Sequence, residues 1–297
     1  AADLADDPAQ AAILWNNAGV CALRVYEPDR AIQCFRQAIE AAQMGPSDGR
    51  RLSRLYAHLT AACYEASRMR EAWAAAHQAL LLAEEFDDIE ATGKALYNLG
   101  LAERYLGEGS EALKLFAASR RNFQESGNAA SAADALHNMG WVQLDRGELE
   151  EAERSLLAAR AERTALWLPV GRIDLELARL ALKRGNWLAA LAQAVEIAES
   201  VEAATDPVTK LQALILAAEA SERDDLAAAF YYAGEALALG LSLGRPPALL
   251  DLMPVIVRLH ANAGSQMPAE ERALAAELFE RRHGMQGQLQ ATAVNLN

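Results

Sequence analysis

Five polar side chains recur along otherwise apolar stretches of this sequence, at a spacing that suits them to hold a ligand. They are Asn17, His58, Asn98, Asn138 and Glu176. An asparagine offers both a hydrogen-bond donor and an acceptor, and the backbone of an extended peptide needs both from its binding surface. We call these five residues the polar ladder and predict that it binds the main chain of a peptide. The alternative is that the side chains bond neighbouring helices and only fix their packing.

No spacing in the sequence is typical of a catalytic or metal site. The five histidines fall in no His-Glu-x-x-His or Cys-His arrangement, and no Gly-x-Ser-x-Gly turn or phosphate-binding loop occurs. The acidic run 84–88 lacks the alternating ligands and central glycine of a calcium loop, so it predicts a solvated linker. We therefore expect no enzyme activity, no metal ion and no cofactor.

The ladder is part of a repeat. Asn98-Leu99-Gly100 and Asn138-Met139-Gly140 stand 40 residues apart, and the same register relates Gly107 to Gly147 and Ala112 to Ala152. A fixed period of this size indicates stacked supersecondary units, none of which can bury its apolar face alone. The sequence therefore predicts an all-α solenoid rather than a globular domain.

Each copy divides into two helices, because apolar residues at helical spacing are interrupted by a turn such as Gly107 to Ser110. Small residues at Gly100 and Ala112 should let the two helices approach closely. We expect Pro254 to kink its helix or make it start late. The predicted helix pairs are 8–24 with 28–44, 50–66 with 69–84, 89–106 with 109–126, 129–146 with 149–163, 168–184 with 187–203, 206–222 with 225–241, and 246–263 with 269–282.

Composition narrows the class of protein and its partners. Hydrophobic residues make up 52% of the 297 residues but aromatic residues only 6%, which favours helix. The formal net charge of −13 argues against nucleic acid or an anionic membrane surface as the main partner. No window approaches the roughly 20 apolar residues of a spanning helix. High Ala and Arg usage hints at a bacterial source.

The cysteines and the start of the chain bear on its compartment. Cys21, Cys34 and Cys63 are odd in number and lack a metal-type spacing, so we expect free thiols in a reducing, cytoplasmic compartment. The chain begins Ala-Ala-Asp without an initiator methionine or an apolar leader, and we expect that any signal or upstream domain is already missing.

Residues at fixed offsets within each copy carry a resemblance to a known family. Trp15, Gly19, Ala31, Phe35 and Ala38 form the pattern in the first copy, and the third repeats it. The chain thereby resembles the tetratricopeptide-repeat (TPR) family. Its copies of about 40 residues resemble the long-repeat branch found in kinesin light chains, mitotic-spindle adaptors and bacterial peptide-sensing regulators. The resemblance implies one right-handed superhelical array over 1–297 of about seven helical hairpins, with an atypical capping unit at 246–282 and a polar tail at 283–297.

By the same resemblance, the first helix of each pair lines a concave groove. The residues that we expect there for peptide binding are Asn17, His58, Lys94, Tyr97, Asn98, Arg104, His137, Asn138, Trp141, Arg172 and Arg179. Asn16, Arg54, Tyr64 and Tyr105 should lie around them. Basic and aromatic side chains in an acidic molecule favour an acidic or carboxyl-terminal peptide. Alternatively, the cations are neutralised by nearby acids: Glu65, Glu103, Asp134, Asp145 and Glu176.

Three classes of function are compatible with these observations. The best supported is a scaffold that captures an extended peptide or a helix of a partner protein. The alternative is the sensor part of a bacterial peptide-responsive regulator or signalling protein whose effector domain lies outside this chain. An enzyme or accessory catalytic domain is disfavoured, because no positioned nucleophile, base or metal set is present.

Overall fold

The computed structural model describes residues 7–25, 27–45, 48–66, 68–200, 205–243, 249, 251–274 and 276. This part divides into two compact units, with the boundary between Val142 and Gln143, inside helix α7. Unit 1 is the part up to Val142 and unit 2 the part from Gln143 onward. Most of the predicted helix 269–282 and the tail 283–297 lie outside the described residues.

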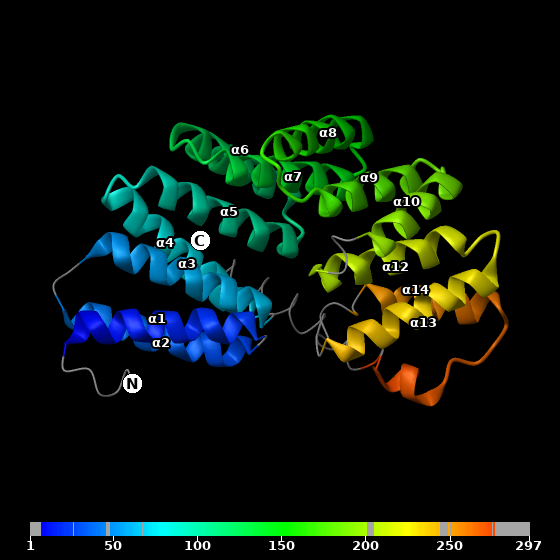
Figure 1. Cartoon of the computed structure of the whole chain (residues 1–297), viewed down its shortest axis with the longest axis horizontal. Helices are drawn as coiled ribbons and strands as arrows, with labels where there is room; N and C mark the ends of the chain where they lie inside the picture. Colours follow the sequence, from blue (N-terminus) through cyan, green and yellow to red (C-terminus); the bar gives the residue numbers. More distant parts are fainter. Residues whose placement is uncertain are drawn as a thin grey trace. The chain divides into compact units, whose positions relative to one another are not determined.

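The described residues form helical hairpins in chain order (Figure 1). The helices are α1 Pro8–Arg24, α2 Pro28–Met44, α3 Gly49–Glu65, α4 Met69–Glu85, α5 Ile89–Leu106, α6 Gly109–Glu125, α7 Ala129–Asp145, α8 Leu149–Ala165, α9 Gly171–Lys183, α10 Trp187–Glu199, α12 Pro207–Ser221, α13 Leu226–Ser242 and α14 Leu252–Asn262. No helix in this part of the chain is long and apolar enough to cross a membrane.

The structure has helices at the first six predicted pairs, with bounds that agree to within a few residues. α9 begins later than predicted, at Gly171, because Leu168 and Pro169 precede it without a capping side chain. α10 ends at Glu199, since Ser200 has an extended backbone with ψ of 155°. α14 begins at Leu252, so Pro254 falls in its first turn, where the missing N–H costs no helical hydrogen bond.

Three first helices begin with the same cap, repeated at the period of the array. Asp48, Asp88 and Asn128 each accept a hydrogen bond from a backbone N–H three residues later, at 3.0 to 3.1 Å. Such a cap satisfies one of the donors that a helix start leaves without a partner. A short polar side chain that recurs every 40 residues thus determines where α3, α5 and α7 begin.

The residue before two of these caps takes a left-handed backbone, and the fifth copy has a bulky residue at the equivalent position. Asp87, Gly127 and Trp167 have φ of 50°, 77° and 56°, respectively. This region costs a glycine little but strains a bulky residue. Trp167 nevertheless stands there, and its side chain is exposed. The loop between α8 and α9 is therefore where the repeat is least regular.

Close packing within a hairpin depends on glycine facing phenylalanine. A Cβ on Gly19 would meet the ring of Phe35 at 2.6 Å, and one on Gly100 would meet Phe116 at 2.8 Å. Both phenylalanine side chains are fully buried. The prediction that Gly100 lets its pair of helices approach closely is confirmed, and the ring of the second helix is what fills the space.

A serine hydrogen bond also joins the two helices of a hairpin, and the serine lies on the first helix in one copy and on the second helix in the next. In the second copy Ser53 on α3 donates to the carbonyl of Ala79 on α4, at 2.9 Å. In the third copy Ser119 on α6 donates to the carbonyl of Gly93 on α5, at 2.7 Å. Ser53 and Gly93, like Ala79 and Ser119, are 40 residues apart. Equivalent positions are thus joined by a hydrogen bond in both copies. The donor is on the first helix in the second copy and on the second helix in the third copy.

The first helices of neighbouring copies contact one another, in addition to the contacts between helices that are adjacent in the chain. In unit 1, α1 contacts α3 and α3 contacts α5; in unit 2, α9 contacts α12 and α12 contacts α14. In unit 2 these contacts are part of a core that includes Leu175, Leu211, Leu216, Leu252 and Leu259. The first helices therefore bring side chains from successive copies side by side, as a ligand site on them requires.

Candidate functional site

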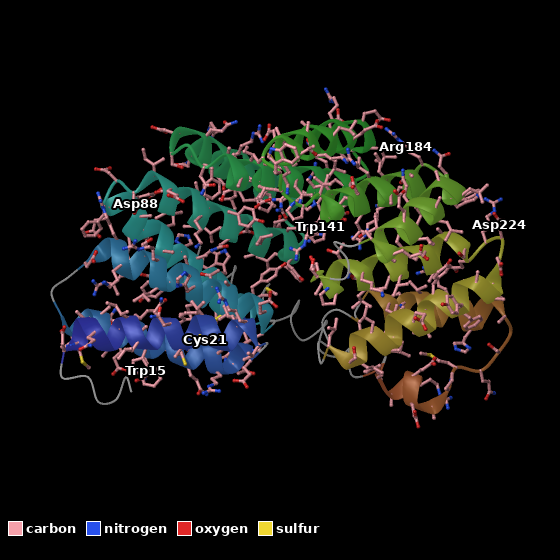
Figure 2. All side chains as sticks on the ribbon, in the orientation of Figure 1. Trp15, Cys21, Asp88, Trp141, Arg184 and Asp224 are labelled. Carbon is pink, nitrogen blue, oxygen red and sulfur yellow. The ribbon has the colours of Figure 1, made fainter. Side chains whose placement is uncertain are left out.

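The predicted site residues of unit 1 lie on α1, α3, α5 and α7, and several of them contact one another across these helices. We call this set the unit 1 face. It consists of Asn16, Arg54, His58, Tyr64, Lys94, Tyr97, Asn98, Arg104, Tyr105, His137, Asn138 and Trp141. Trp141, at the carboxyl-terminal part of α7, is labelled in Figure 2.

His58 joins three copies at one end of the unit 1 face. Its Nδ1 lies 2.8 Å from Oδ1 of Asn16 on α1, and its ring lies 5.5 Å from the ring of Phe35 on α2. Burial, and to a smaller extent the positive charges of Lys94 and Arg54, together lower the pKa of His58 from 6.5 to about 4. His58 is therefore neutral at physiological pH. Asn16, and not the predicted Asn17, is its partner; Asn17 is exposed.

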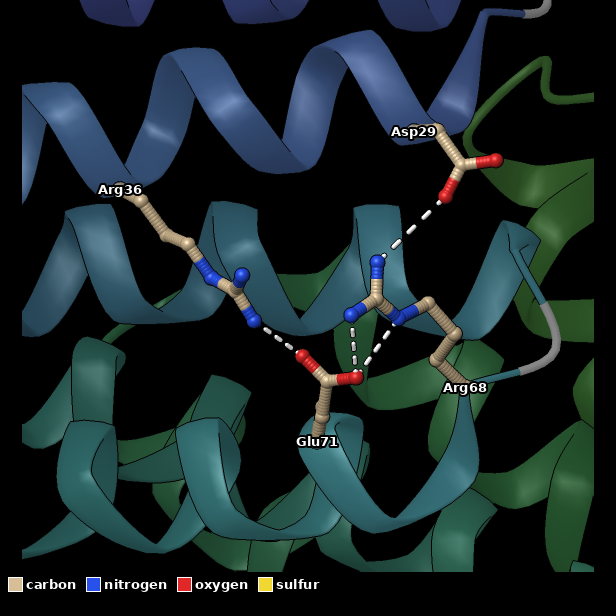
Figure 3. Close-up of polar contacts among 4 residues, drawn as sticks. All are labelled: Asp29, Arg36, Arg68 and Glu71. Atoms are coloured by element: carbon tan, nitrogen blue, oxygen red, sulfur yellow. Dashed lines mark hydrogen bonds and ion pairs between the residues drawn. The ribbon is translucent and has the colours of Figure 1, made fainter.

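The cations beside His58 differ from those on the second helices. Arg54 and Lys94 are exposed, and neither has an ion-pair partner among the described residues. On α2 and α4, by contrast, Glu71 accepts from both Arg36 and Arg68, with 2.6 Å to the latter, and Arg68 also reaches Asp29 at 3.4 Å (Figure 3). Positive charge is thus neutralised on that surface and left available on the unit 1 face.

Asn138 and Asn98 occupy equivalent ladder positions but are used differently. The Nδ2 of Asn138 donates to Oη of Tyr97 at 2.8 Å and to the carbonyl of Asp134 at 2.9 Å, and the side chain is only 4% exposed. Asn98 is half-buried, and no described residue is bonded to its side chain. The packing interpretation fits Asn138 and His58, whereas Asn98 keeps its hydrogen-bonding capacity.

Aromatic rings gather at the other end of the unit 1 face. The guanidinium of Arg104 lies 3.2 Å from the ring centre of Trp141, and Tyr64 meets Tyr105 edge to face at 5.3 Å. Burial raises the pKa of Tyr64 well above 10, with Tyr105 adding to the effect, so its hydroxyl stays protonated. His137 stacks nearly parallel to Trp141 at 6.5 Å. These rings form a rigid surface with polar edges.

In unit 2 the predicted cations are held by acids. Arg172 donates to Asp206 at 2.9 and 3.0 Å. Arg179 pairs with Glu176 at 3.3 Å and with Gln212. Burial disfavours the charge of Arg179, but Glu176, Asp251, Glu219 and Asp145 outweigh it and raise its pKa. Glu176, the fifth ladder residue, is 4% exposed.

The sequence analysis missed the residues of α12 and α14 that complete this arrangement. Gln212 donates to Asp251 at 3.3 Å, and Arg258 pairs with Glu219 and with Glu222, both at 3.2 Å. These residues stand between 33 and 39 positions from their partners. A period of 40 residues does not relate them, because the copies in unit 2 depart from it. No cluster of three or more His, Cys, Asp or Glu that could hold a metal ion occurs in the described part.

Comparison with known proteins agrees with this arrangement of helices. Residues 91–161 match the family model for the tetratricopeptide repeat. None of the curated proteins compared with the sequence matched it. The match confirms the predicted family resemblance in the third and fourth copies. Solved structures show a likeness of fold over most of the chain.

Three solved structures represent the range of the likeness. They are the Rap conjugation gene regulator of the plasmid pLS20 in complex with the Phr* peptide (TM-score 0.71, 15% identity, 93% of this chain and 75% of that chain), aspartyl phosphate phosphatase F from Bacillus subtilis (0.63, 15%, 89% and 64%), and the TPR-like repeats of a putative kinesin light chain from Podosopora anserina (0.52, 15%, 68% and 99%). At such identities the likeness is one of fold. The chain therefore has the all-α helical-repeat fold of tetratricopeptide-repeat structures.

Proposed function

We propose that this chain is a scaffold that binds a peptide or a helix of a partner protein on the unit 1 face. The observation that carries the proposal is the combination, on helices that touch, of exposed Arg54 and Lys94 with the stacked pair of Arg104 and Trp141. A protein of the same fold, the Rap regulator of pLS20, is in complex with a peptide, which favours a peptide as the ligand.

The chemistry of the face suits a peptide that carries both an acidic group and an apolar side chain. Tryptophan, tyrosine and arginine dominate binding energy at protein interfaces, where they lie in well-packed, desolvated pockets. Arg104 is already fixed against Trp141, so less side-chain entropy is lost when a ligand binds there. Exposed cations add charge-assisted hydrogen bonds to a carboxylate.

Of the polar ladder, only Asn98 is proposed to bind the peptide directly. Asn98 is the member that offers its amide to a peptide backbone, while Asn138 positions the ring of Tyr97 and His58 bonds Asn16. Binding of the main chain then depends on Asn98, and the contribution of Asn138 is indirect. That the bound peptide controls an effector, as in the sensor alternative, stays a prediction.

The experiment compares two stacked cation and tryptophan pairs in the same chain. Binders are selected from a library of random short peptides against the intact protein and titrated by fluorescence polarisation. Trp141→Ala should weaken binding at least about tenfold, as expected for an interface hot spot. The matched control is Trp187→Ala, because Arg223 lies 4.2 Å from the ring centre of Trp187 in unit 2.

The outcomes separate the proposal from its competitors. Equal affinity of the Trp141→Ala variant and the unaltered chain would exclude the unit 1 face as the binding surface. Loss of binding only in the Trp187→Ala variant would move the site to unit 2. Circular dichroism of each variant establishes that the helices persist.

A further inference from the structure

One group of side chains on the unit 1 face has a chemistry that peptide binding alone does not require. Arg54 and His58 are one helical turn apart on α3, and Lys94 and Asn98 are one turn apart on α5. Residues at this spacing lie on the same side of a helix. α3 and α5 contact each other, and α1 supplies Asn16 to the imidazole. The group therefore gathers two cations, one titratable ring and two amides from three first helices.

The charges that act on His58 are all positive. From α3 and α5 they are Arg54 and Lys94, while α1 and α2 present the neutral Asn16 and Phe35. α4 contributes no charged group to the ring, and no acid acts on it among the described residues. Elsewhere in unit 1, Arg36 on α2 and Arg68 just before α4 have carboxylate partners (Figure 3). A site that collects like charges is stabilised by an anion from outside.

The hydrogen bond to Asn16 determines what the ring can offer to that anion. With Oδ1 of Asn16 as acceptor, Nδ1 of His58 carries the hydrogen. The neutral ring then has only a lone pair at Nε2, which repels a carboxylate. Protonation turns Nε2 into a donor, and no described residue is bonded to that atom. A bound anion and a proton on His58 therefore favour each other.

We infer that Arg54, His58 and Lys94 form a binding site for a carboxylate of the partner peptide, and that His58 takes up one proton from solvent when the carboxylate binds. The inference rests on the proposed function, because the carboxylate belongs to the ligand proposed above. The step is a binding equilibrium: the protein with a neutral His58, a carboxylate and one proton give a complex in which His58 is an imidazolium ion. No covalent bond forms or breaks.

Linkage sets the sign of the pH dependence. Burial and the charges of Lys94 and Arg54 hold the pKa of free His58 near 4; the carboxylate offsets those charges, so the pKa in the complex is higher. Between those two values the complex holds one proton more than the free protein. Affinity consequently rises as the pH falls through this window, by at most about tenfold per pH unit for one proton.

The first test follows His58 directly and needs no peptide. Sulfate serves as the probe, because its charge does not change between pH 4.5 and 7.5, and sodium chloride at matched ionic strength controls for screening. The titration of the imidazole is read by NMR, with His58→Gln identifying its signal among the five histidines. The pKa of His58 should rise from about 4 more in sulfate than in chloride. Equal shifts in the two salts would mean that only screening operates and would overturn the inference.

Variants test whether the two cations cause the effect. Replacing both Arg54→Gln and Lys94→Gln should raise the pKa of His58 without any anion and abolish the extra shift in sulfate. The matched control is Lys114→Gln, an exposed lysine on a second helix that pairs with Glu111 at 2.7 Å. An unaltered response to sulfate in the double variant would contradict the assignment, and the control should respond as the unaltered chain does.

The peptide experiment separates this inference from the proposed function. A selected peptide is titrated at pH 7 and pH 5.5 as the free acid and as the carboxyl-terminal amide, and again after its acidic side chains are replaced by amides. Affinity for the acid that rises at pH 5.5, and does not rise in His58→Gln, supports the inference; the form that loses the effect identifies which carboxylate binds. Binding that needs Trp141 but shows no such pH response would refute the inference and leave the proposed function standing. Binding that ignores Trp141 would refute the proposed function, whereas the sulfate result stands or falls independently.

Discussion

The cations that the sequence analysis placed on the first helices differ between units 1 and 2 in whether an acid pairs with them. In unit 2, Arg172, Arg179 and Arg258 are paired with Asp206, Glu176 and Glu219, respectively. In unit 1, Arg54 and Lys94 have no such partner among the described residues. Charges that are satisfied within the fold stabilise it and leave little for a ligand. The comparison teaches that basic residues on first helices do not by themselves predict a binding surface.

The largest expected effect tests this contrast through stability. Arg179→Ala should lower the free energy of unfolding by about 3 kcal/mol, because it removes a partner of the buried carboxylate of Glu176. Lys94→Ala should change it by less than about 0.5 kcal/mol, as for an exposed side chain. Urea denaturation followed by circular dichroism measures both. Similar losses of stability in the two variants would contradict the distinction between the paired cations of unit 2 and Lys94 of unit 1, which has no ion-pair partner among the described residues.

The same substitution should have opposite signs at two glycines. Gly100→Ala places a methyl group 2.8 Å from the ring of Phe116, and such overpacking costs about 1–3 kcal/mol. Gly234→Ala on α13 meets nothing within 4 Å, so it should stabilise the helix by about 0.5–1 kcal/mol. Thermal unfolding of both variants provides the comparison. Stabilisation of equal size at both positions would show that helix propensity, and not the contact with phenylalanine, decides.

Within unit 1, the two ladder asparagines should separate stability from binding. Asn138→Ala should cost about 1–2 kcal/mol of folding stability, because it leaves the Tyr97 hydroxyl and the Asp134 carbonyl without this buried donor. Asn98→Ala should leave stability nearly unchanged and weaken a selected peptide. Denaturation and peptide titration of each variant are compared. If Asn98→Ala were the more destabilising change, the packing and ligand roles would be reversed.

The smallest effect concerns the pH dependence of folding. The pKa of His58 is lowered to about 4 in the folded chain from an ordinary value of 6.5. Between these values the unfolded chain binds a proton that the folded chain refuses, so the free energy of unfolding decreases as the pH falls from 6.5 to 4. His58→Gln should flatten this decrease. Identical pH profiles for the unaltered chain and His58→Gln would contradict the low pKa.

The spacing of residues predicted the helices well but predicted their partners poorly. Helix bounds follow from local features, such as the apolar period and Gly107 at a left-handed turn, so α1 and α2 agree with the sequence at both ends. The capping residues Asp48, Asp88 and Asn128 repeat every 40 residues and could also have been found. At Trp167 no local rule predicts a bulky residue where a glycine fits.

The side-chain partners depend on distances across copies, which no spacing specifies. The sequence suggested Asn17 for the ladder, but Asn16 bonds His58, because the direction of a side chain on α1 depends on how α1 packs against α3. Gln212 and Arg258 were missed for the same reason. A rotation of one residue about a helix axis is about 100° and changes which neighbour a side chain meets.

The amino-acid sequence by itself determined that this chain is a series of helical hairpins, because helix formation, capping and the glycine and phenylalanine contact act over a few turns and recur with the period. Only the tertiary structure decided which cations are neutralised. Whether a carboxylate reaches a guanidinium depends on angstrom-scale distances between copies, and the Coulomb energy falls with that distance. Arg179 finds Glu176 and Gln212, while Lys94 beside His58 finds no acid in the described part of the chain.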